Sequence, residues 1–136
     1  QWGDQQISLT EDYETVGTAT KSPLDGAWKM IKSYSITGKD TTAGTGTQFK
    51  MYGNGYFIFG NTYSDSAKKN HTGMGYGKFA MTGTNKSKES VMVSTYYEIR
   101  GKDVDLDIEM NGADEYKQTI KWDNSIGVEI YQRMKK

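Results

Sequence analysis

The stretch Asp103-Val104-Asp105-Leu106-Asp107-Ile108-Glu109-Met110 alternates acidic and apolar residues along its whole length. Successive side chains of a β-strand point to opposite faces, so this period of two gathers the acids on one face and the apolar side chains on the other. A strand with one face in water and one in a core is typical of antiparallel sheets. The stretch therefore predicts a half-buried strand over residues 103–110.

The same stretch begins like a calcium-binding loop, because acids stand at alternate positions. Such a loop needs glycine at its sixth position and glutamate at its twelfth. This chain has Ile108 and Asp114 there. A solvated strand face is the better interpretation, and we expect no metal site.

This strand also predicts the register of the strand that follows it. A five-residue loop over Asn111–Glu115 places Met110 opposite Tyr116 on one face and Glu109 opposite Lys117 on the other. Apolar pairs and pairs of opposite charge both stabilise neighbouring antiparallel strands. A slip of one residue would bury the charges, so this register is the expected one.

The last strand follows by the same reasoning. A three-residue loop over 123–125 pairs Trp122 with Ile126 across the turn. The last-strand residues then expected in the core are Ile126, Val128 and Ile130.

On the other side of residues 103–110, the preceding strand is expected near 90–99. Its alternation places Tyr97 opposite Leu106 and Ile99 opposite Val104. Both pairs would lie on the inner face.

A second hairpin is predicted from residues 49–52 and 56–59, which flank Gly53-Asn54-Gly55. A two-residue Asn54-Gly55 turn would mix the two faces, whereas a three-residue loop with Gly55 at positive φ separates them. We expect the three-residue loop, with Lys50 outside. The residues then expected inside are Phe49, Met51, Phe57 and Phe59.

The alternation runs through most of the chain after residue 25. Strands are expected near 26–36, 47–52, 56–60, 74–82, 90–99, 103–110, 116–122 and 126–133. Successive hairpins without helices between them make a meander, and closing eight one-faced strands on themselves removes both the exposed apolar surface and the open edges. The predicted fold is therefore all-β, an antiparallel up-and-down eight-stranded barrel over residues 23–136. Residues 1–22 are polar and acidic and are predicted to form a flexible N-terminal arm.

Composition excludes several classes of protein. Seventeen basic residues balance seventeen acidic ones among 136 residues, so no global positive field favours nucleic acid. The absence of cysteine excludes disulfides, thiolate zinc sites, a catalytic cysteine and a lipoprotein anchor. No run of apolar residues comes close to the length of a membrane-spanning helix, which is about 20 residues. No signal-peptide pattern precedes Gln1, so the chain is interpreted as a cytosolic protein or as the mature form of an exported one.

Two features resemble lipocalins and their calycin relatives. Gly26-Ala27-Trp28 at the start of the first strand resembles their Gly-x-Trp signature, and Arg133 stands late in the last strand. The resemblance implies that Arg133 packs over Trp28 at the closed end of the barrel as a cation–π pair. Strict alternation from Ile130 would instead put Arg133 outside, so the contact requires a bulge or the geometry of barrel closure. The alternative is that Trp28 is ordinary core and Arg133 an exposed terminal charge.

More narrowly, residues 24–133 are similar to uncharacterised lipocalin-like proteins exported by anaerobic gut bacteria. The similarity lies in Gly75–Lys78 and in Tyr131-Gln132-Arg133. It implies the barrel fold and export to the periplasm or the exterior. It implies no particular ligand, because that family has none that is settled.

The long loops indicate which end of the barrel is open. Residues 37–46 and 60–73 are the longest connections, and they share an end with 100–102 and 123–125. The inner residues predicted to bind a ligand near that end are Phe57, Phe59, Tyr97, Ile99, Leu106 and Trp122. This lining favours a small hydrophobic or amphipathic molecule, with a solid core as the alternative.

Catalysis finds no support in the sequence. His71 is the only histidine and falls in a loop, and no acidic residue is expected on the inner face of the later strands. We therefore predict a binding protein that needs no cofactor. The competing interpretation is a solid scaffold that binds a glycan or a protein through tyrosines expected on its outer surface, which are Tyr52, Tyr56, Tyr96 and Tyr131.

Overall fold

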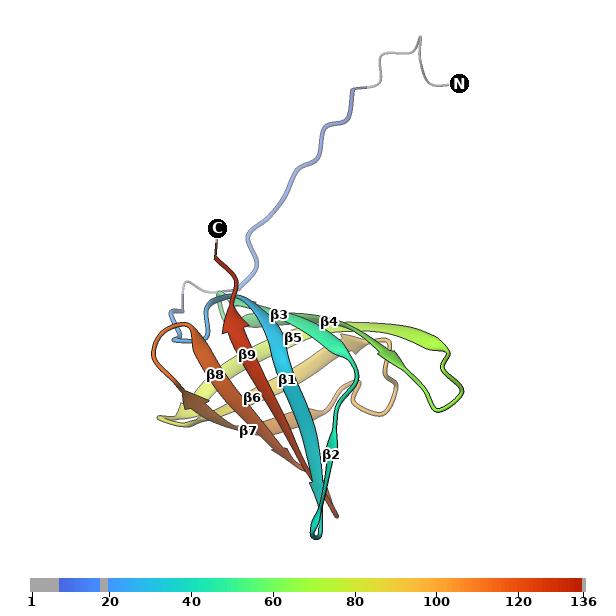
Figure 1. Ribbon diagram of the computed structural model, residues 1–136. Coiled ribbons are helices and arrows are strands. Elements are labelled where there is room, and N and C mark those ends of the chain that lie inside the picture. The colour runs from blue at the N-terminus through green and yellow to red at the C-terminus, as the bar shows by residue number, and fades with distance from the viewer. Residues whose placement is uncertain (1–7, 18–19, 136) are drawn as a thin grey trace, which may run out of the picture.

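The computed structural model describes residues 8–17 and 20–135. Nine strands and no helix occur in these residues (Figure 1). The strands are β1 (Gly26–Thr37), β2 (Asp40–Ala43), β3 (Thr47–Gly53), β4 (Tyr56–Ser64), β5 (Asn70–Gly83), β6 (Lys86–Ser94), β7 (Asp103–Met110), β8 (Glu115–Lys121) and β9 (Ile126–Arg133).

The strands close into a barrel. From β3 to β9 each strand pairs with the next in antiparallel fashion, and β1 pairs with both β3 and β9. Strand β2 is an addition, because it pairs with the far end of β1 over residues 34–37 and forms a hairpin that projects from the barrel (Figure 1). The predicted all-β, up-and-down, eight-stranded antiparallel barrel is confirmed.

Strand β7 has the two faces that its alternation predicts. Leu106 and Ile108 are buried inside the barrel. Its register with β8 is also the predicted one, since Met110 lies opposite Tyr116 and Glu109 opposite Lys117. The Glu109 carboxylate is 2.8 Å from the Lys117 ammonium on the outer face.

The β3–β4 hairpin corrects a prediction. Gly53 lies opposite Tyr56, so the turn contains two residues, Asn54 at φ 52° and Gly55 at φ 77°. Two successive positive φ angles define the type I′ turn, whose twist matches that of the strands it joins. Phe57 and Phe59 remain inside, but the faces of β3 are exchanged.

The exchange on β3 has a clear consequence for the interior. Phe49 and Met51, expected inside, are 43% and 56% exposed. Lys50, expected outside, is only 3% exposed, and its neighbour Tyr52 is buried too. The turn therefore brings a charged side chain and a phenol into the barrel.

Gly55→Ala tests this turn, and we expect it to lower the free energy of unfolding by about 1 to 2 kcal/mol. An added Cβ at Gly55 meets no atom closer than 3.9 Å, so the effect comes from the positive φ and not from a clash. Gly53→Ala is the matched control, because that residue has no positive φ and open space around an added Cβ. Urea unfolding measures both, and equal losses would contradict the two-residue turn.

The β8–β9 hairpin corrects a second register. Lys121 lies opposite Ile126, so the loop contains residues 122–125 instead of three residues. The shift by one residue turns the other face of β9 inward. Of the three residues expected in the core, Val128 is nevertheless buried, whereas Ile126 and Ile130 are half-buried. Glu129 and Tyr131 now lie beside Gln118 and Tyr116, inside the barrel.

The segment after β6 corrects a third prediction. Strand β6 ends at Ser94 and residues 95–102 form turns, so the expected pairs of Tyr97 with Leu106 and Ile99 with Val104 are wrong. Instead Leu106 lies opposite Ser87. Backbone hydrogen bonds from Arg100 to Tyr97 and from Gly101 to Val91 fold the segment back on itself.

Residues 8–16 precede the barrel and are all exposed (Figure 1). Residues 1–7 and 18–19 of the predicted flexible arm lie outside the described residues. The division into an arm and a barrel domain stays a prediction.

Candidate ligand-binding cavity

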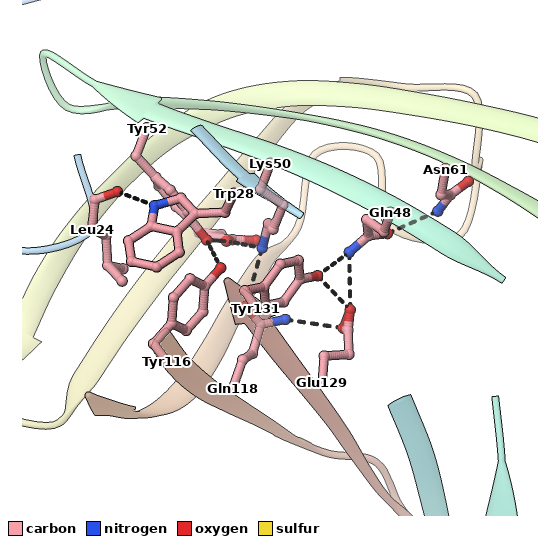
Figure 2. Close-up of polar contacts among 11 residues, drawn as sticks. Leu24, Trp28, Gln48, Lys50, Tyr52, Asn61, Tyr116, Gln118, Glu129 and Tyr131 are labelled. Atoms are coloured by element: carbon pink, nitrogen blue, oxygen red, sulfur yellow. Dashed lines mark hydrogen bonds and ion pairs between the residues drawn. The ribbon is translucent and has the colours of Figure 1, made fainter. Parts of the chain in front are cut away.

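A tryptophan fills the closed end of the barrel. Trp28 is fully buried, and its indole N–H donates to the Leu24 carbonyl at 2.7 Å. The Tyr116 ring meets the Trp28 ring edge-on, with 4.7 Å between the ring centres, and Tyr131 stacks on Tyr116 at 4.9 Å. These rings form a floor beneath the rest of the interior (Figure 2).

Arg133 covers the outer side of this floor. Its guanidinium carbon lies 4.2 Å from the centre of the Trp28 ring. The guanidinium also donates to the carbonyls of Asp25 at 2.5 Å, Ala113 at 3.0 Å and Pro23 at 3.2 Å. The β8–β9 register explains this placement, because the same shift that brings Tyr131 inside also turns Arg133 toward Trp28.

Above the floor lies an open cavity of about 1170 Å³. Four of the six residues predicted to bind a ligand line it, namely Phe59, Ile99, Leu106 and Trp122. Phe57 is buried in the core and does not line the cavity. Tyr97 is 78% exposed and does not line it, because residues 95–102 form turns instead of an extension of β6.

The cavity reaches solvent at the end of the barrel that carries the segment after β6 and Trp122, and through the wall between β7 and β8. The lining at that end comes from Tyr96, Glu98, Ile99, Lys102 and Trp122. The paired residues of β7 and β8 stop at Asp107 and Thr119, and the two strands diverge beyond them (Figure 1). Outward-facing Asp105 and Lys121 therefore border the cavity together with inward-facing residues.

A buried ion pair lies between the floor and the cavity. The Lys50 ammonium is 2.5 Å from the Glu89 carboxylate, and these residues are 3% and 7% exposed. Lys50 also donates to the Gln118 carbonyl oxygen at 3.1 Å, and the Tyr52 hydroxyl donates to Glu89 at 2.8 Å. Each charge therefore has an opposite charge and a further hydrogen bond, as buried charges require.

A second carboxylate, that of Glu129 on β9, faces the cavity nearby. It accepts hydrogen bonds from Gln48 at 2.9 Å, from the Tyr131 hydroxyl at 2.8 Å and from Gln118 at 3.2 Å. Figure 2 shows both amide groups pointing at this carboxylate, that of Gln48 at one oxygen and that of Gln118 at the other. Glu89 and Glu129 correct the expectation that the inner face of the later strands lacks acidic residues.

The tyrosine hydroxyls around the buried ion pair and Glu129 stay protonated at neutral pH. Burial raises the pKa of Tyr52, Tyr116 and Tyr131 well above the ordinary value for tyrosine. The charge of Glu89 raises the pKa of Tyr52 further, and that of Glu129 does the same for Tyr131. Each hydroxyl can therefore serve as a hydrogen-bond donor to its neighbour.

His71 lies apart from this interior. Its Nε2 is 2.7 Å from Asp65 on the β4–β5 connection, its ring stacks on Tyr63, and it does not line the cavity. Among the described residues no group of three or more acidic or histidine side chains is placed to hold a metal ion. Nor does any helix in that part of the chain have the length and apolar character to cross a membrane.

The fold and the cavity together define an eight-stranded antiparallel barrel whose sheet closes on itself and whose interior holds a cavity that is open to solvent. No protein-family model matches the chain, and no curated protein matches it. Among solved structures it is similar to a redesigned β-barrel, with 13% identity, a TM-score of 0.49 and coverage of 83% of this chain and 93% of that one. It is also similar to a de novo designed fluorescence-activating β-barrel, with 12% identity, a TM-score of 0.47 and coverage of 81% and 93%. For Rv2717c from M. tuberculosis the identity is 11%, the TM-score 0.38 and the coverage 84% and 94%.

Proposed function

We propose that this protein is a lipocalin-like binding protein that holds a small hydrophobic or amphipathic molecule in its barrel without catalysing a reaction. The observation that carries the proposal is the open cavity of about 1170 Å³, whose wall includes Phe59, Leu106 and Trp122. Ligand sites are typically concave and apolar, with a few placed polar groups. Lipocalin membership is supported by Trp28 at the start of β1 and by Arg133 over its ring.

The absence of catalysis is part of this proposal. Its support is that Glu89 is tied to Lys50 and that His71 is paired with Asp65 away from the cavity. Export to the periplasm or the exterior is also proposed, and its support is the resemblance to exported lipocalin-like proteins. Fractionation of cells that make the protein naturally tests export, and recovery from the cytosol alone would contradict it.

Trp122→Ala tests the cavity, and we expect it to weaken binding of the neutral dye Nile red about tenfold. Trp122 lines the cavity and is 53% exposed, so a bound apolar molecule would cover its ring. Large aromatic side chains at binding sites typically contribute about 2 kcal/mol or more, and about 1.4 kcal/mol corresponds to a factor of ten. Dye fluorescence during titration measures the dissociation constant.

Tyr97→Ala is the matched control, because Tyr97 is an exposed aromatic residue that does not line the cavity. We expect its dissociation constant to stay within about twofold of the native value. A native protein that takes up no dye would contradict the proposal. Mass spectrometry of gently purified protein would identify any molecule that remains bound.

The second candidate function is binding through the outer surface, and the residues that support it are not the tyrosines expected from the sequence. Tyr52 and Tyr131 are buried, and Tyr56 and Tyr96 are half-buried, so the expected tyrosine surface does not form. Instead exposed apolar side chains follow one row across β3 to β6, namely Met51, Ile58, Tyr76 and Val93. An exposed apolar row of this kind favours a protein partner over a glycan.

A further inference from the structure

The polar side chains of the lumen form a hydrogen-bond chain with one direction. The Tyr96 hydroxyl donates to Asn61 at 2.5 Å, and the Asn61 amide donates to Gln48 at 3.0 Å. Gln48 in turn donates to Glu129, and from the other side Gln118 donates to Glu129 while accepting from Lys50. The Glu129 carboxylate is therefore the acceptor at which both branches end.

The charges of the lumen do not balance. The Lys50 charge is offset by Glu89 at 2.5 Å, whereas no ion pair among the described residues includes Glu129. The cavity lining carries the same sign of excess, since it contains four lysines and six carboxylates, of which Asp105 is paired with Lys88 outside the lining. A cavity with this composition attracts a positive charge and repels a negative one.

Glu129 is also accessible to a molecule in the cavity. It is half-buried and lines the cavity, and three neutral donors hold its carboxylate in place. A carboxylate offers about four lone-pair positions, so a further donor finds an acceptor there. The apolar side chains that line the rest of the cavity include Phe59, Val91, Leu106 and Ile120.

We propose that the lumen selects amphipathic molecules with a cationic, hydrogen-bond-donating head group, an ammonium, and that Glu129 is its counter-ion. This inference rests on the proposed function, because it names the class of ligand for the same cavity. The apolar tail packs on the cavity wall and the ammonium lies against Glu129. The negative charge of Glu129 repels an amphiphile with a carboxylate head. Lys50 does not compensate for this repulsion, because its charge is already paired with that of Glu89.

Competition with Nile red tests the head-group preference on the native protein. Dodecylamine, dodecanol and dodecanoate share one tail, and each is used below the concentration at which it forms micelles. We expect dodecylamine to displace the dye at concentrations at least about tenfold lower than dodecanoate, with dodecanol between them. Equal potency of the three, or a preference for dodecanoate, would overturn the inference. Binding of the dye itself would still support the proposed function.

Glu129→Gln assigns the preference to this carboxylate. The amide keeps the shape and an acceptor oxygen but removes the charge, so we expect the ratio between dodecylamine and dodecanoate to fall to within about twofold. Glu109→Gln is the matched control, because it makes the same chemical change on the outer face of β7 and should keep the native ratio. An unchanged ratio in Glu129→Gln would overturn the role of Glu129.

The outcomes separate the two proposals. Failure of the native protein to bind the dye defeats the proposed function and the inference with it. Dye binding without an amine preference defeats the inference alone. If Glu129→Gln does not fold, which its loss of dye binding and of the strand signal in circular dichroism would show, the comparison of head groups on the native protein still decides the preference.

Discussion

Glu89→Gln is expected to lower the free energy of unfolding by about 3 kcal/mol, because it leaves the Lys50 ammonium buried without an opposite charge. Lys50 is 3% exposed and lies 2.5 Å from Glu89, so the partner charge cannot be replaced by bulk water. Stability of a domain is typically about 5 to 15 kcal/mol, so the loss is a large share of it. Urea unfolding followed by circular dichroism measures the change.

Two variants show whether the effect comes from the unpaired charge. Lys50→Met combined with Glu89→Gln removes both charges, and we expect its stability within about 1 kcal/mol of the native value. Glu109→Gln breaks an exposed ion pair with Lys117 and should cost less than about 1 kcal/mol. If Glu89→Gln costs no more than Glu109→Gln, the ion pair does not lie inside the barrel as described.

The architecture could be predicted from the sequence because alternation is a local property. In residues 103–110 the polarity of each side chain indicates whether it lies on the solvent face or the core face of the strand, and neighbouring strands repeat the pattern. Closure of the sheet into a barrel could be predicted from the number of strands that have one apolar face. An open sheet of eight such strands would expose that apolar surface and two unpaired edges. The pairing of β1 with β9 confirms that reasoning.

The registers at two turns could not be predicted by the rule that apolar residues lie inside. On β3 that rule favoured Phe49 and Met51, whereas the barrel holds Lys50 because Glu89, 39 residues further along the chain, is there to pair with it. A shift of one residue exchanges the whole face of a strand, so one wrong turn misplaces several residues. The signal that identifies the correct turn was present, because Asn54-Gly55 is the preferred sequence of a type I′ turn.

The cavity was located more accurately than its polar groups. Phe59, Leu106 and Trp122 were assigned to the lumen from alternation and line it in the structure. Glu129 was missed because the predicted loop before β9 was one residue too short, which turned that side chain outward. Long-range hydrogen bonds such as that from Gln48 to Glu129 join residues 81 positions apart, and no local pattern reports them.

Trp28→Ala is expected to lower the free energy of unfolding by about 3 to 5 kcal/mol. The indole is fully buried, meets the Tyr116 ring and bonds the Leu24 carbonyl, so truncation leaves a cavity and an unpaired acceptor at the closed end. Trp122→Ala is the matched control, since that ring is 53% exposed and its loss should cost less than about 1 kcal/mol. Similar losses in the two variants would contradict the placement of Trp28 in the floor.

The contact between Trp28 and Arg133 has an energy of its own, which a double-mutant cycle isolates. Arg133→Met keeps an apolar stem but removes the guanidinium that lies 4.2 Å from the indole and donates to three carbonyls. We expect Arg133→Met alone to cost about 2 kcal/mol, because several charge-assisted hydrogen bonds are lost together. Combined with Trp28→Ala it should cost about 1 kcal/mol less than the sum of the two single losses, which is the cation–π term. A sum without this difference would mean that Arg133 stabilises the closed end only through its hydrogen bonds to the carbonyls of Pro23, Asp25 and Ala113 and its ion pair with Asp114, so that the indole contributes only its buried area.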